Sequence, residues 1–442
     1  MLTRPFAETN VPRYTSYPTA PHFSAAVDAA TYAGWLARLP DDAALSLYLH
    51  VPYCRELCLY CGCHTKAVRQ AAPLDDYTRT LRAEIALAAG RTRARRVTHI
   101  HFGGGTPSLL GADNLVAVMF ALAHAFRIGG ETEIAIELDP RSVDRAMAAA
   151  LAGMRVSRAS LGVQDLSPEV QHAIGRIQPY ETVVRATELL RAAGIGQLNF
   201  DLMYGLPKQT AERAVRTARL AAALRPQRIS LFGYAHVPWM KAHQRCIEEA
   251  DLPGPDERLV QSEAARAVLI DHGYVPIGLD HFALPDDGLA LAAGRARLHR
   301  NFQGYTTDDA DALIGLGASA IGRLPQGYVQ NAPDVGGYAR AVHAGRLATV
   351  RGLALSEDDR VRGGIIERLM CGLRVDLRDV GRDWRDFPGA HERLSPLASE
   401  GLVQIDGSSL TVTERGRPFV RLAAAAFDAY LQPDRQRHSQ AV

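Results

Sequence analysis

Six short apolar runs alternate with helical patterns through the middle of this chain, and this alternation restricts the possible folds more than any other feature of the sequence. The runs occupy residues 45–51, 97–102, 133–138, 155–163, 197–204 and 228–234. The helical patterns, with charged residues on one face, occupy residues 74–89, 115–126, 180–193 and 211–224. Strands and helices in this order build a parallel sheet with right-handed connections. We therefore predict an α/β fold, and six units favour a partial (β/α)6 barrel over a closed eight-stranded barrel.

Each of the six runs is followed by residues that do not serve packing. They are Cys54, the glycine-rich stretch 103–107, Glu137 with Asp139, Gln164 with Asp165, Asp201 with Tyr204, and the stretch 234–238. Parallel α/β proteins bind ligands at the carboxyl ends of their strands, where the following loops converge. We therefore expect these groups to share one binding site at one end of the barrel.

Four of the six cysteines form the pattern Cys54-x-x-x-Cys58-x-x-Cys61-x-Cys63 directly after the first run. Three thiolates on so short a tether can hold three corners of a four-iron cubane and leave the fourth iron open for chemistry. A structural zinc site is the alternative, although zinc sites usually take pairs of ligands from two separated loops. The pattern therefore favours an iron–sulfur cluster with an open iron.

Composition indicates a globular protein of the cytoplasm. With 442 residues, 47% hydrophobic and 22% charged, the chain can bury a large core and should divide into two or more domains. It begins without the apolar segment of a signal peptide, and its later apolar stretches are short for a bilayer, so we expect no stable membrane association. Clustered free thiols suit a reducing compartment, and the isolated Cys246 and Cys371 are assigned no role. A net charge of +2 does not favour nucleic acid as a partner.

The cysteine loop resembles that of the radical S-adenosylmethionine superfamily. The loop and its flanks carry the patterns Tyr48-x-His50-x-Pro52-x-Cys54 and Cys61-Gly62-Cys63. These patterns are similar to one branch of the superfamily, the oxygen-independent coproporphyrinogen III oxidases. Further stretches similar to this family are 12–19, 103–107, 162–165, 201–210, 278–282 and 299–306. The resemblance therefore covers nearly the whole chain.

This resemblance implies an enzyme with an iron–sulfur cofactor and a nucleoside cosubstrate. Cys54, Cys58 and Cys61 would ligate one [4Fe-4S] cluster, and S-adenosylmethionine would bind the open iron. An electron from the reduced cluster would release a 5′-deoxyadenosyl radical, which takes hydrogen from the substrate. The implied substrate is coproporphyrinogen III, two of whose propionates are decarboxylated to vinyl groups to give protoporphyrinogen IX in heme biosynthesis. A monomeric enzyme served by an external electron donor, such as a flavodoxin or ferredoxin, is implied as well.

The resemblance also assigns residues to two molecules of S-adenosylmethionine. Contacts of the cluster-bound molecule would be Tyr48, Gly104, Glu137 and Ile321. A second molecule, for the second decarboxylation, would be lined by Tyr60, Gly105, Thr106, Gln164, Arg176, Asp201 and Ala235. Taken singly, such residues have ordinary alternatives, because polar side chains at strand ends can cap helices and most arginines are solvated surface charges.

Cys63 and four basic residues are candidates for substrate contacts. Three cysteines complete the protein ligands of the cluster, so Cys63 would face the substrate as a hydrogen donor or packing group, or would stabilise the loop. Four propionates require cationic partners, and the planar fork of arginine suits carboxylates. The candidates are Arg13, Lys66, Arg300 and Lys208.

The rest of the chain is predicted to flank the barrel. Residues 1–44 would form an arm that covers the barrel, 45–350 the barrel with an extension, and 351–442 a small winged-helix-like domain. The elements of this domain would be a helix at 356–373 that begins at a capping serine, a helix at 391–400, a hairpin at 401–413 with an Asp-Gly turn, and a long helix from Gly416. We expect the domain to act as a lid or wall at the barrel mouth, and the charged end from Gln432 to fray.

Two other functions are compatible with parts of the sequence. One is a different radical enzyme that acts on heme or another tetrapyrrole, which the Cys61-Gly62-Cys63 pattern and the arm disfavour. The other is a redox regulator that senses through its cluster and binds DNA through the winged-helix-like segment, although that segment is not strongly basic.

Overall fold

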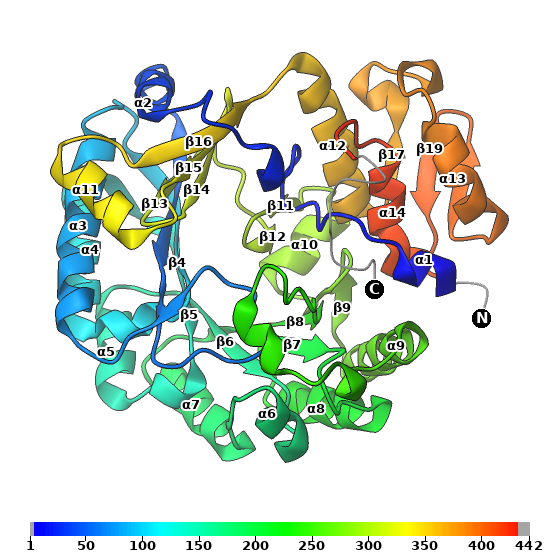
Figure 1. The fold of residues 1–442 in the computed structure, drawn as a ribbon, viewed down its shortest axis with the longest axis horizontal. Coiled ribbons are helices and arrows are strands. Elements are labelled where there is room, and N and C mark those ends of the chain that lie inside the picture. Colours follow the sequence, from blue (N-terminus) through cyan, green and yellow to red (C-terminus); the bar gives the residue numbers. More distant parts are fainter. Residues whose placement is uncertain (1–3, 432–442) are drawn as a thin grey trace.

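The structure, a computed structural model, describes residues 4–431 and is built around one large curved sheet (Figure 1). Its twelve strands follow the order β16-β15-β14-β13-β1-β4-β5-β6-β7-β8-β10-β9. Neighbouring strands from β13 to β8 are parallel. The six predicted strands are β1 (Ala44–Val51), β4 (Arg96–Gly104), β5 (Arg127–Leu138), β6 (Arg158–Gln164), β7 (Gln197–Tyr204) and β8 (Arg228–Gly233). They lie side by side in chain order, which confirms the predicted parallel α/β core.

Helices cover the outer side of the parallel strands in Figure 1. They are α3 (Ala72–Ala89), α4 (Ala112–Ala125), α5 (Arg145–Gly153), α6 (Pro168–Ala173), α7 (Tyr180–Ala192) and α8 (Ala211–Ala223). Strand β1 is buried along nearly its whole length, as expected for a parallel strand covered on both faces. The short helices α5 and α6 are not among the predicted elements, because α5 is rich in alanine and α6 covers less than two turns. Within residues 4–431, no helix combines the length and the apolar character needed to span a bilayer.

The sheet is wider than predicted at both edges. Strand β13 (Ala312–Leu316) pairs with β1 in parallel, with Leu45 opposite Ala312 and Leu49 opposite Leu316. The antiparallel strands beyond the parallel core are β14 (Ile321–Leu324), β15 (Gly327–Asn331) and β16 (Thr349–Ala354) at one edge, and β10 (His281–Ala283) and β9 (Val275–Ile277) at the other. Helices α9 (Pro255–Asp271), α10 (Gly288–Gly294) and α11 (Val335–His343) and the hairpin β11 (His299–Asn301) with β12 (Gly304–Thr306) connect them. The partial barrel therefore gains a seventh parallel strand from far along the chain.

A buried carboxylate ties the added strands to the barrel. Glu84 of α3 accepts hydrogen bonds from the backbone N–H of Gly317 and from Nδ2 of Asn331, each at 2.6 Å. Burial raises the pKa of Glu84 to about 7. Tyr77, on the same helix, donates its hydroxyl to the carbonyl of His50 at 2.6 Å. Helix α3 thus joins the turn after β13 to the end of β1, where the cysteine loop begins.

An ion pair between β4 and the segment before β13 makes part of the stability depend on pH. His99 Nδ1 lies 3.1 Å from Asp308 Oδ1. Burial alone would lower the pKa of His99, but the close contact with Asp308 and the charge of that carboxylate outweigh burial and raise this pKa. The pair therefore stabilises the fold fully below the unfolded pKa of about 6.5, and this contribution is lost as pH rises through the raised folded value.

We expect His99→Gln to lower the free energy of unfolding more at about pH 6 than at about pH 9, by on the order of 1 kcal/mol. Denaturant titration of the wild type and the variant at both pH values measures this difference. Equal losses at the two pH values would show that the pair does not titrate as described.

The C-terminal residues form a small domain of helices and a three-stranded sheet. Its elements are α12 (Glu357–Gly372), β17 (Arg374–Asp376), α13 (Ala390–Ser399), β18 (Val403–Asp406), β19 (Ser409–Val412) and α14 (Val420–Ala425). Ser356 and Asp359 form a capping box at the start of α12, and Gly407 has a φ of 57° in the turn of the hairpin. The two helices and the hairpin therefore lie where the sequence predicts them.

The prediction of a long helix from Gly416 is wrong within the described residues. A 3-10 turn at Arg417–Phe419 is followed by α14, which has six residues. The side chain of Asp428 accepts hydrogen bonds from the backbone of Tyr430 at 2.8 Å and from the hydroxyl of Tyr14 at 3.0 Å. Such side-chain bonds replace the bonds that a continuing helix would make. The charged end from residue 432 lies outside the described residues.

The N-terminal arm packs against this C-terminal domain. The arm contains α1 (Arg4–Glu8) and α2 (Ala29–Ala37). Val11, Tyr14 and Tyr17 belong to one hydrophobic cluster with residues of α12 and α14. Arg421 of α14 donates through Nε to the carbonyl of Pro12 at 2.9 Å and through Nη2 to the carbonyl of Val11. The C-terminal domain therefore holds the arm in a defined position.

Candidate active site

The carboxyl ends of the parallel strands open into a cavity of about 1450 Å³. The predicted site residues that line it are Cys54, Cys58, Tyr60, Cys61, Cys63, Gly104, Gly105, Thr106, Glu137, Gln164, Arg176, Asp201 and Ala235. The arm contributes Val11, Pro12, Arg13 and Pro21, whereas none of the described residues after 350 lines the cavity. The parallel topology thus brings the cysteine loop and the polar strand ends together, and the arm closes part of the mouth.

Two predicted contacts, Tyr48 and Ile321, are not among the residues that line this cavity. Tyr48 donates its hydroxyl to His50 Nδ1 at 2.9 Å, and its ring stacks on His101 with centroids 5.9 Å apart. A Cβ on Gly103 would meet both Tyr48 and Glu137 within 3 Å, so Tyr48 lies directly behind the lining. Ile321 instead lines a smaller cavity of about 260 Å³ beside the arm.

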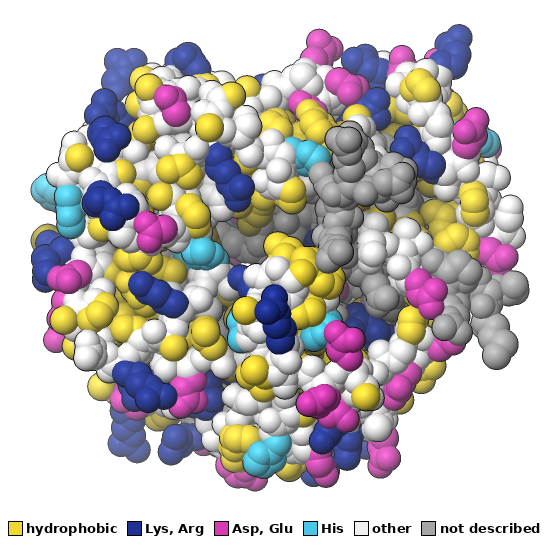
Figure 2. Space-filling model, in the orientation of Figure 1, with side chains coloured by type: hydrophobic (Ala, Val, Ile, Leu, Met, Phe, Trp, Pro, Cys, Tyr) yellow, Lys and Arg dark blue, Asp and Glu magenta, His cyan; other side chains and the backbone are white. Residues whose placement is uncertain are grey.

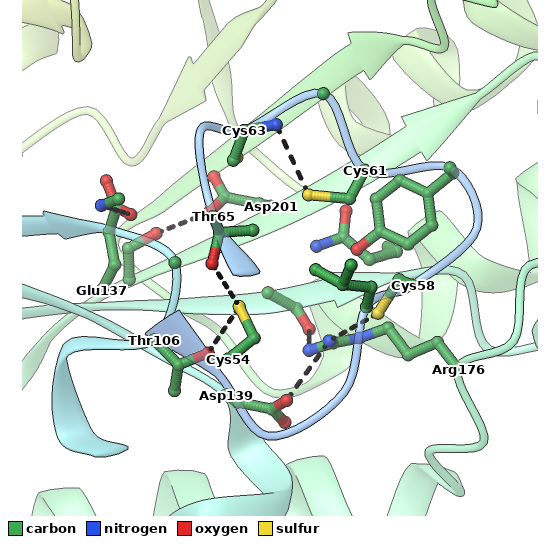
Figure 3. Close-up of a pocket in the computed structure, with 18 of the residues that line it drawn as sticks. Cys54, Cys58, Cys61, Cys63, Thr65, Thr106, Glu137, Asp139, Arg176 and Asp201 are labelled. Atoms are coloured by element: carbon green, nitrogen blue, oxygen red, sulfur yellow. Dashed lines mark hydrogen bonds and ion pairs between the residues drawn. The ribbon is translucent and has the colours of Figure 1, made fainter. Parts of the chain in front are cut away.

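The cysteine loop presents three sulfur atoms around one space (Figure 3). Strand β2 (Tyr53–Cys54) pairs with β3 (Lys66–Ala67) and closes the base of the loop. Each of the three sulfurs accepts a hydrogen bond from the protein. The donors to Cys54 Sγ are the hydroxyls of Thr65 at 3.3 Å and Thr106 at 3.5 Å. The donor to Cys58 Sγ is Arg176 Nη1 at 3.5 Å, and the donor to Cys61 Sγ is the backbone N–H of Cys63 at 3.4 Å.

These contacts fit a cluster ligated by Cys54, Cys58 and Cys61. Hydrogen bonds to the sulfurs favour thiolates and help to set the potential of a bound iron–sulfur cluster. A hydrogen bond from the Cys63 thiol lowers the pKa of Cys61 and raises that of Cys63, whereas burial raises the pKa of Cys54. In the described part of the chain, no three His, Cys, Asp or Glu side chains are placed to hold a single metal ion. Zinc ligands converge on one atom, whereas cubane ligands bind separate irons.

The backbone of the cysteine loop is held from outside by side chains of a segment that the sequence patterns did not single out. His243 Nε2 lies 2.7 Å from the carbonyl of Cys61, and Lys241 Nζ donates to the carbonyl of Cys63 at 2.7 Å. Gln244 Nε2 donates to the carbonyl of Tyr60 at 2.9 Å. In the sequence, these residues are visible only as three donor side chains within residues 241–244. The fold is needed to show that they bind the cysteine loop.

His50 fixes the far end of the same loop. Because the hydroxyl of Tyr48 donates to Nδ1, the ring can donate through Nε2 to the carbonyl of His64 at 2.9 Å. Burial lowers the pKa of His50, which favours this neutral form. Gly104, with a φ of 115°, packs on the ring, and a Cβ there would lie 2.7 Å from His50 Cε1. The glycine is therefore required for the close approach of β4 to His50 on β1.

Glu137 is an ionised carboxylate at the end of β5. Oε2 accepts the backbone N–H of Gly104 at 3.0 Å, and Oε1 lies 3.1 Å from His101 Nε2. Burial alone would raise the pKa of Glu137, but the bonds and charge of His101 and the bond from Gly104 outweigh burial and lower this pKa. Glu137 thus accepts a hydrogen bond from the backbone after β4, as polar side chains at strand ends commonly do. It also presents a negative charge to the cavity.

Arg176 joins the strand ends to the cysteine loop. Besides its bond to Cys58, it donates to the carbonyl of Gly162 at 2.8 Å and pairs with Asp139 at 3.3 Å. Burial opposes its charge, but Tyr60, Asp139 and Cys58 outweigh burial and raise the pKa of Arg176. Arg176 is therefore a buried, fixed charge of the site. The alternative that it is a solvated surface charge is wrong.

Gln164 and Asp201 face the cavity from β6 and β7. Gln164 has a φ of 64° next to a register shift between these strands, a conformation that costs about 1 kcal/mol in a residue other than glycine. Asp201 accepts hydrogen bonds from the hydroxyl of Ser160 and from Nδ2 of Asn199, each at 2.8 Å. Burial raises the pKa of Asp201. The side chain of Asp201 is therefore held by its neighbours Ser160 and Asn199.

Of the four basic residues predicted to meet propionates, Arg13 lines the cavity and the others do not. Arg300 lies behind it and donates through Nη2 to the carbonyl of Arg13 at 3.4 Å. Lys66 is exposed, and Lys208 pairs with Asp251 at 3.5 Å. Lining arginines that the sequence patterns missed are Arg55, Arg141 and Arg185. They lie outside the distinctive motifs, so nothing local marks them.

Comparison with known proteins identifies the family. Residues 48–221 match the family description "Radical SAM superfamily", and residues 355–419 match "HemN C-terminal domain". The chain is 51% identical over 442 residues to the oxygen-independent coproporphyrinogen III oxidase of Bradyrhizobium diazoefficiens, covering 99% of this chain and 98% of the relative. It is 44% identical to that of Paracoccus denitrificans, covering 96% and 95%.

A solved structure agrees with this result. The structure of coproporphyrinogen III oxidase from Escherichia coli, described as a radical SAM enzyme, superposes with a TM-score of 0.90 at 38% identity, covering 96% of this chain and 100% of that chain. The cofactors of this superfamily, a [4Fe-4S] cluster and S-adenosylmethionine, are those predicted from the cysteine loop. The structural zinc site and the DNA-binding regulator are thereby set aside. With this level of identity along nearly its whole length, the chain belongs to the family of oxygen-independent coproporphyrinogen III oxidases.

Proposed function

We propose that this protein decarboxylates two propionate side chains of coproporphyrinogen III to vinyl groups, giving protoporphyrinogen IX without oxygen. The observation that carries the proposal is a single cavity that contains both the cysteine loop and the polar strand ends, in a chain of this family. Each decarboxylation removes one hydrogen atom, one electron and carbon dioxide from a propionate. The site must therefore generate a strong hydrogen acceptor and shield it from water.

Cys54, Cys58 and Cys61 would hold three irons of the cluster and leave the fourth iron facing the cavity. When bound, the reduced cluster supplies the electron that cleaves S-adenosylmethionine to methionine and a 5′-deoxyadenosyl radical. The protein's own part is to orient this molecule and to exclude solvent. The hydrogen bonds to the three sulfurs and the clamped loop backbone keep the ligands in place.

Glu137 is the group best placed to orient the cluster-bound molecule. Its carboxylate can accept hydrogen bonds from the ammonium or ribose hydroxyls, which are charge-assisted and therefore strong. Gly104 would leave its backbone open to close approach, and Tyr48 would act from behind the lining. Ile321 would act from the smaller cavity beside the arm. A second S-adenosylmethionine would be lined by Tyr60, Gly105, Thr106, Gln164, Arg176, Asp201 and Ala235.

Gly105 supports this use of the strand end. A Cβ at this position would lie 2.5 Å from the carbonyl oxygen of Tyr53 and 2.5 Å from the hydroxyl of Thr65. Thr65 in turn bonds Cys54 Sγ, so a larger residue at position 105 would push on a cluster ligand. Gly105 would thus bring the proposed site of the second S-adenosylmethionine close to the cysteine loop.

The electron would come from an external protein such as a flavodoxin or ferredoxin, acting on a monomeric enzyme. On the face shown in Figure 2, hydrophobic side chains lie over the segment after β8, and acidic and basic side chains are interspersed around them. Trp239 and Met240 in this segment are 45% and 68% exposed, and the neighbouring Lys241 bonds the cysteine loop. An apolar surface beside the cluster ligands suits brief contact with a donor protein.

The test is anaerobic reconstitution with iron and sulfide, followed by reduction and incubation with S-adenosylmethionine and coproporphyrinogen III. Mass spectrometry of the tetrapyrrole should show loss of two carbon dioxide molecules and four hydrogen atoms. Recovery of unchanged substrate from protein with a full cluster would refute the proposal. A product that is not a divinyl tetrapyrrole would instead favour a different radical enzyme acting on this substrate class.

Cys63→Ser separates the fourth cysteine from the cluster ligands. We expect the variant to keep the iron content and visible absorbance of the cluster, because Cys63 gives its thiol and backbone N–H to Cys61 and is not itself a ligand. Turnover should fall, since the site loses the thiol that faces the cavity. Loss of the cluster absorbance would show that Cys63 is a ligand.

A further inference from the structure

Five arginines line the cavity: Arg13, Arg55, Arg141, Arg176 and Arg185. Arg141 and Arg176 are both paired with Asp139. Arg13 is set apart from the others by its surroundings. Its side chain is accessible, yet surrounding protein buries it enough to lower its pKa. Arg13 lines both the large cavity and the smaller cavity beside the arm.

The position of Arg13 is set by contacts with three other parts of the chain. Arg13 Nη2 donates to the carbonyl of Gly233 at the end of β8, at 3.0 Å. The backbone on either side is fixed by Arg421, which donates to the carbonyl of Pro12 at 2.9 Å, and by Arg300, which donates to the carbonyl of Arg13 at 3.4 Å. The guanidinium is therefore preorganised, and binding an anion would cost little conformational entropy.

Positive charge is concentrated behind Arg13. The side chain of Arg300 is 6% exposed, and its Nη1 lies 3.9 Å from Asp280 Oδ1 in an ion pair. Its Nε and Nη1 have no hydrogen-bond partner among the described residues. Burial and the charges of Arg13 and Arg300 lower the pKa of Arg421 to about 9. Asp280 is a carboxylate near this group, and its hydrogen bond with His281 and the charges of Arg300 and Arg13 outweigh burial and lower its pKa to about 2. Arg13 and Arg300 thus share the carboxylate of Asp280, and the charge of Arg421 lies close to both. Positive charge that is only partly balanced favours an anionic ligand at Arg13, the one of the three that lines the cavity.

We propose that Arg13 binds a propionate carboxylate of the tetrapyrrole, and that Arg300 is a positioning residue behind it. Only one nitrogen of the Arg13 side chain donates to a described residue, which leaves the remaining N–H groups for a carboxylate. The arm therefore recognises substrate directly, and the C-terminal domain acts on the site by holding the arm. The inference rests on the proposed function, because the ligand is a side chain of its substrate.

The test changes each partner of the proposed contact in turn, the Arg13 side chain and the carboxylates of the tetrapyrrole. Cluster-loaded protein is titrated under anaerobic conditions with coproporphyrin III, the stable oxidised tetra-acid, and with its uncharged tetra-amide. We expect Arg13→Gln to weaken binding of the tetra-acid by about 10- to 100-fold, the range for a hydrogen-bonded charge pair. Arg13→Lys keeps the charge without the fork and should fall between the wild type and Arg13→Gln. The tetra-amide should bind the wild type and Arg13→Gln equally.

Arg38→Gln is the matched control, because it removes the same charge from an exposed arginine at the end of α2 that does not line the cavity. It should leave both affinities unchanged. Unchanged tetra-acid binding by Arg13→Gln would overturn the proposal, and so would an equal loss for the tetra-acid and the tetra-amide, which indicates a general change of shape. Product analysis with the wild type tests the proposed function separately, since a carboxylate contact at Arg13 would persist in a protein that forms another product.

Discussion

Cys58→Ala should yield protein that holds no intact [4Fe-4S] cluster and has no detectable turnover. Cys58 is one of the three proposed ligands on a single loop, and its sulfur accepts a hydrogen bond from Arg176 at 3.5 Å. Alanine removes the ligand, so one iron would lose its attachment to the protein. It also removes the sulfur that accepts a hydrogen bond from the buried guanidinium of Arg176. Iron and sulfide analysis, visible absorbance and product formation measure the effect.

Cys246→Ala is the matched control for this experiment. Cys246 is an exposed cysteine in the segment after β8, and it does not line the cavity. The control should bind as much iron and sulfide as the wild type and should turn over normally. A Cys58→Ala protein with the wild-type content of iron and sulfide would contradict the ligand assignment. Uptake of zinc in place of iron and sulfide by the wild type would overturn the mechanism as a whole.

Glu137→Gln should lower the efficiency of S-adenosylmethionine cleavage by about 10- to 100-fold while the cluster stays intact. The carboxylate accepts from Gly104 with one oxygen and contacts His101 with the other. Glutamine keeps the size but has only one acceptor oxygen, so one of these donors is left facing an N–H₂ group. The negative charge available to the ammonium of S-adenosylmethionine is lost as well. Formation of 5′-deoxyadenosine by the reduced enzyme measures the effect.

Glu133→Gln provides the comparison on the same strand. Glu133 accepts from Arg158 at 3.3 and 3.4 Å and does not line the cavity. This variant loses the same charge from β5, so it should cleave S-adenosylmethionine at the wild-type rate even if its stability falls. Wild-type cleavage by Glu137→Gln would remove Glu137 from the binding site. Loss of the cluster in that variant would instead point to a role in folding of the loop.

The coupling between distant parts of the chain is a property of the whole fold. The arm lines the cavity, but the C-terminal domain provides the hydrophobic cluster and the Arg421 bonds that hold it there. Changes in a domain that does not itself line the cavity can therefore reach the substrate site. This contact gives a physical reason why the radical SAM region and the C-terminal domain occur together in one chain.

The sequence alone predicts the elements whose signal is local. Strand β7 has the predicted bounds, 197–204, because apolar side chains alternate within it and the flanking residues break the pattern. The loop proposed to hold the cluster is likewise local, since its three proposed ligands are separated by only three and two intervening residues and need no distant partner. The convergence of the polar strand ends also follows from the sequence, because parallel strands place their carboxyl ends at one edge of the sheet.

Only the tertiary structure decides which distant segments complete the barrel and the site. Strand β13 pairs with β1 across more than 260 residues, and nothing in either segment encodes that partner. The donors at 241–244 and the arginine of the arm are ordinary polar residues until the fold sets them against the loop and the cavity. Hydrophobic periodicity records which face of an element is buried, whereas contacts between distant polar groups depend on how the elements pack, and sequence periodicity does not record that packing.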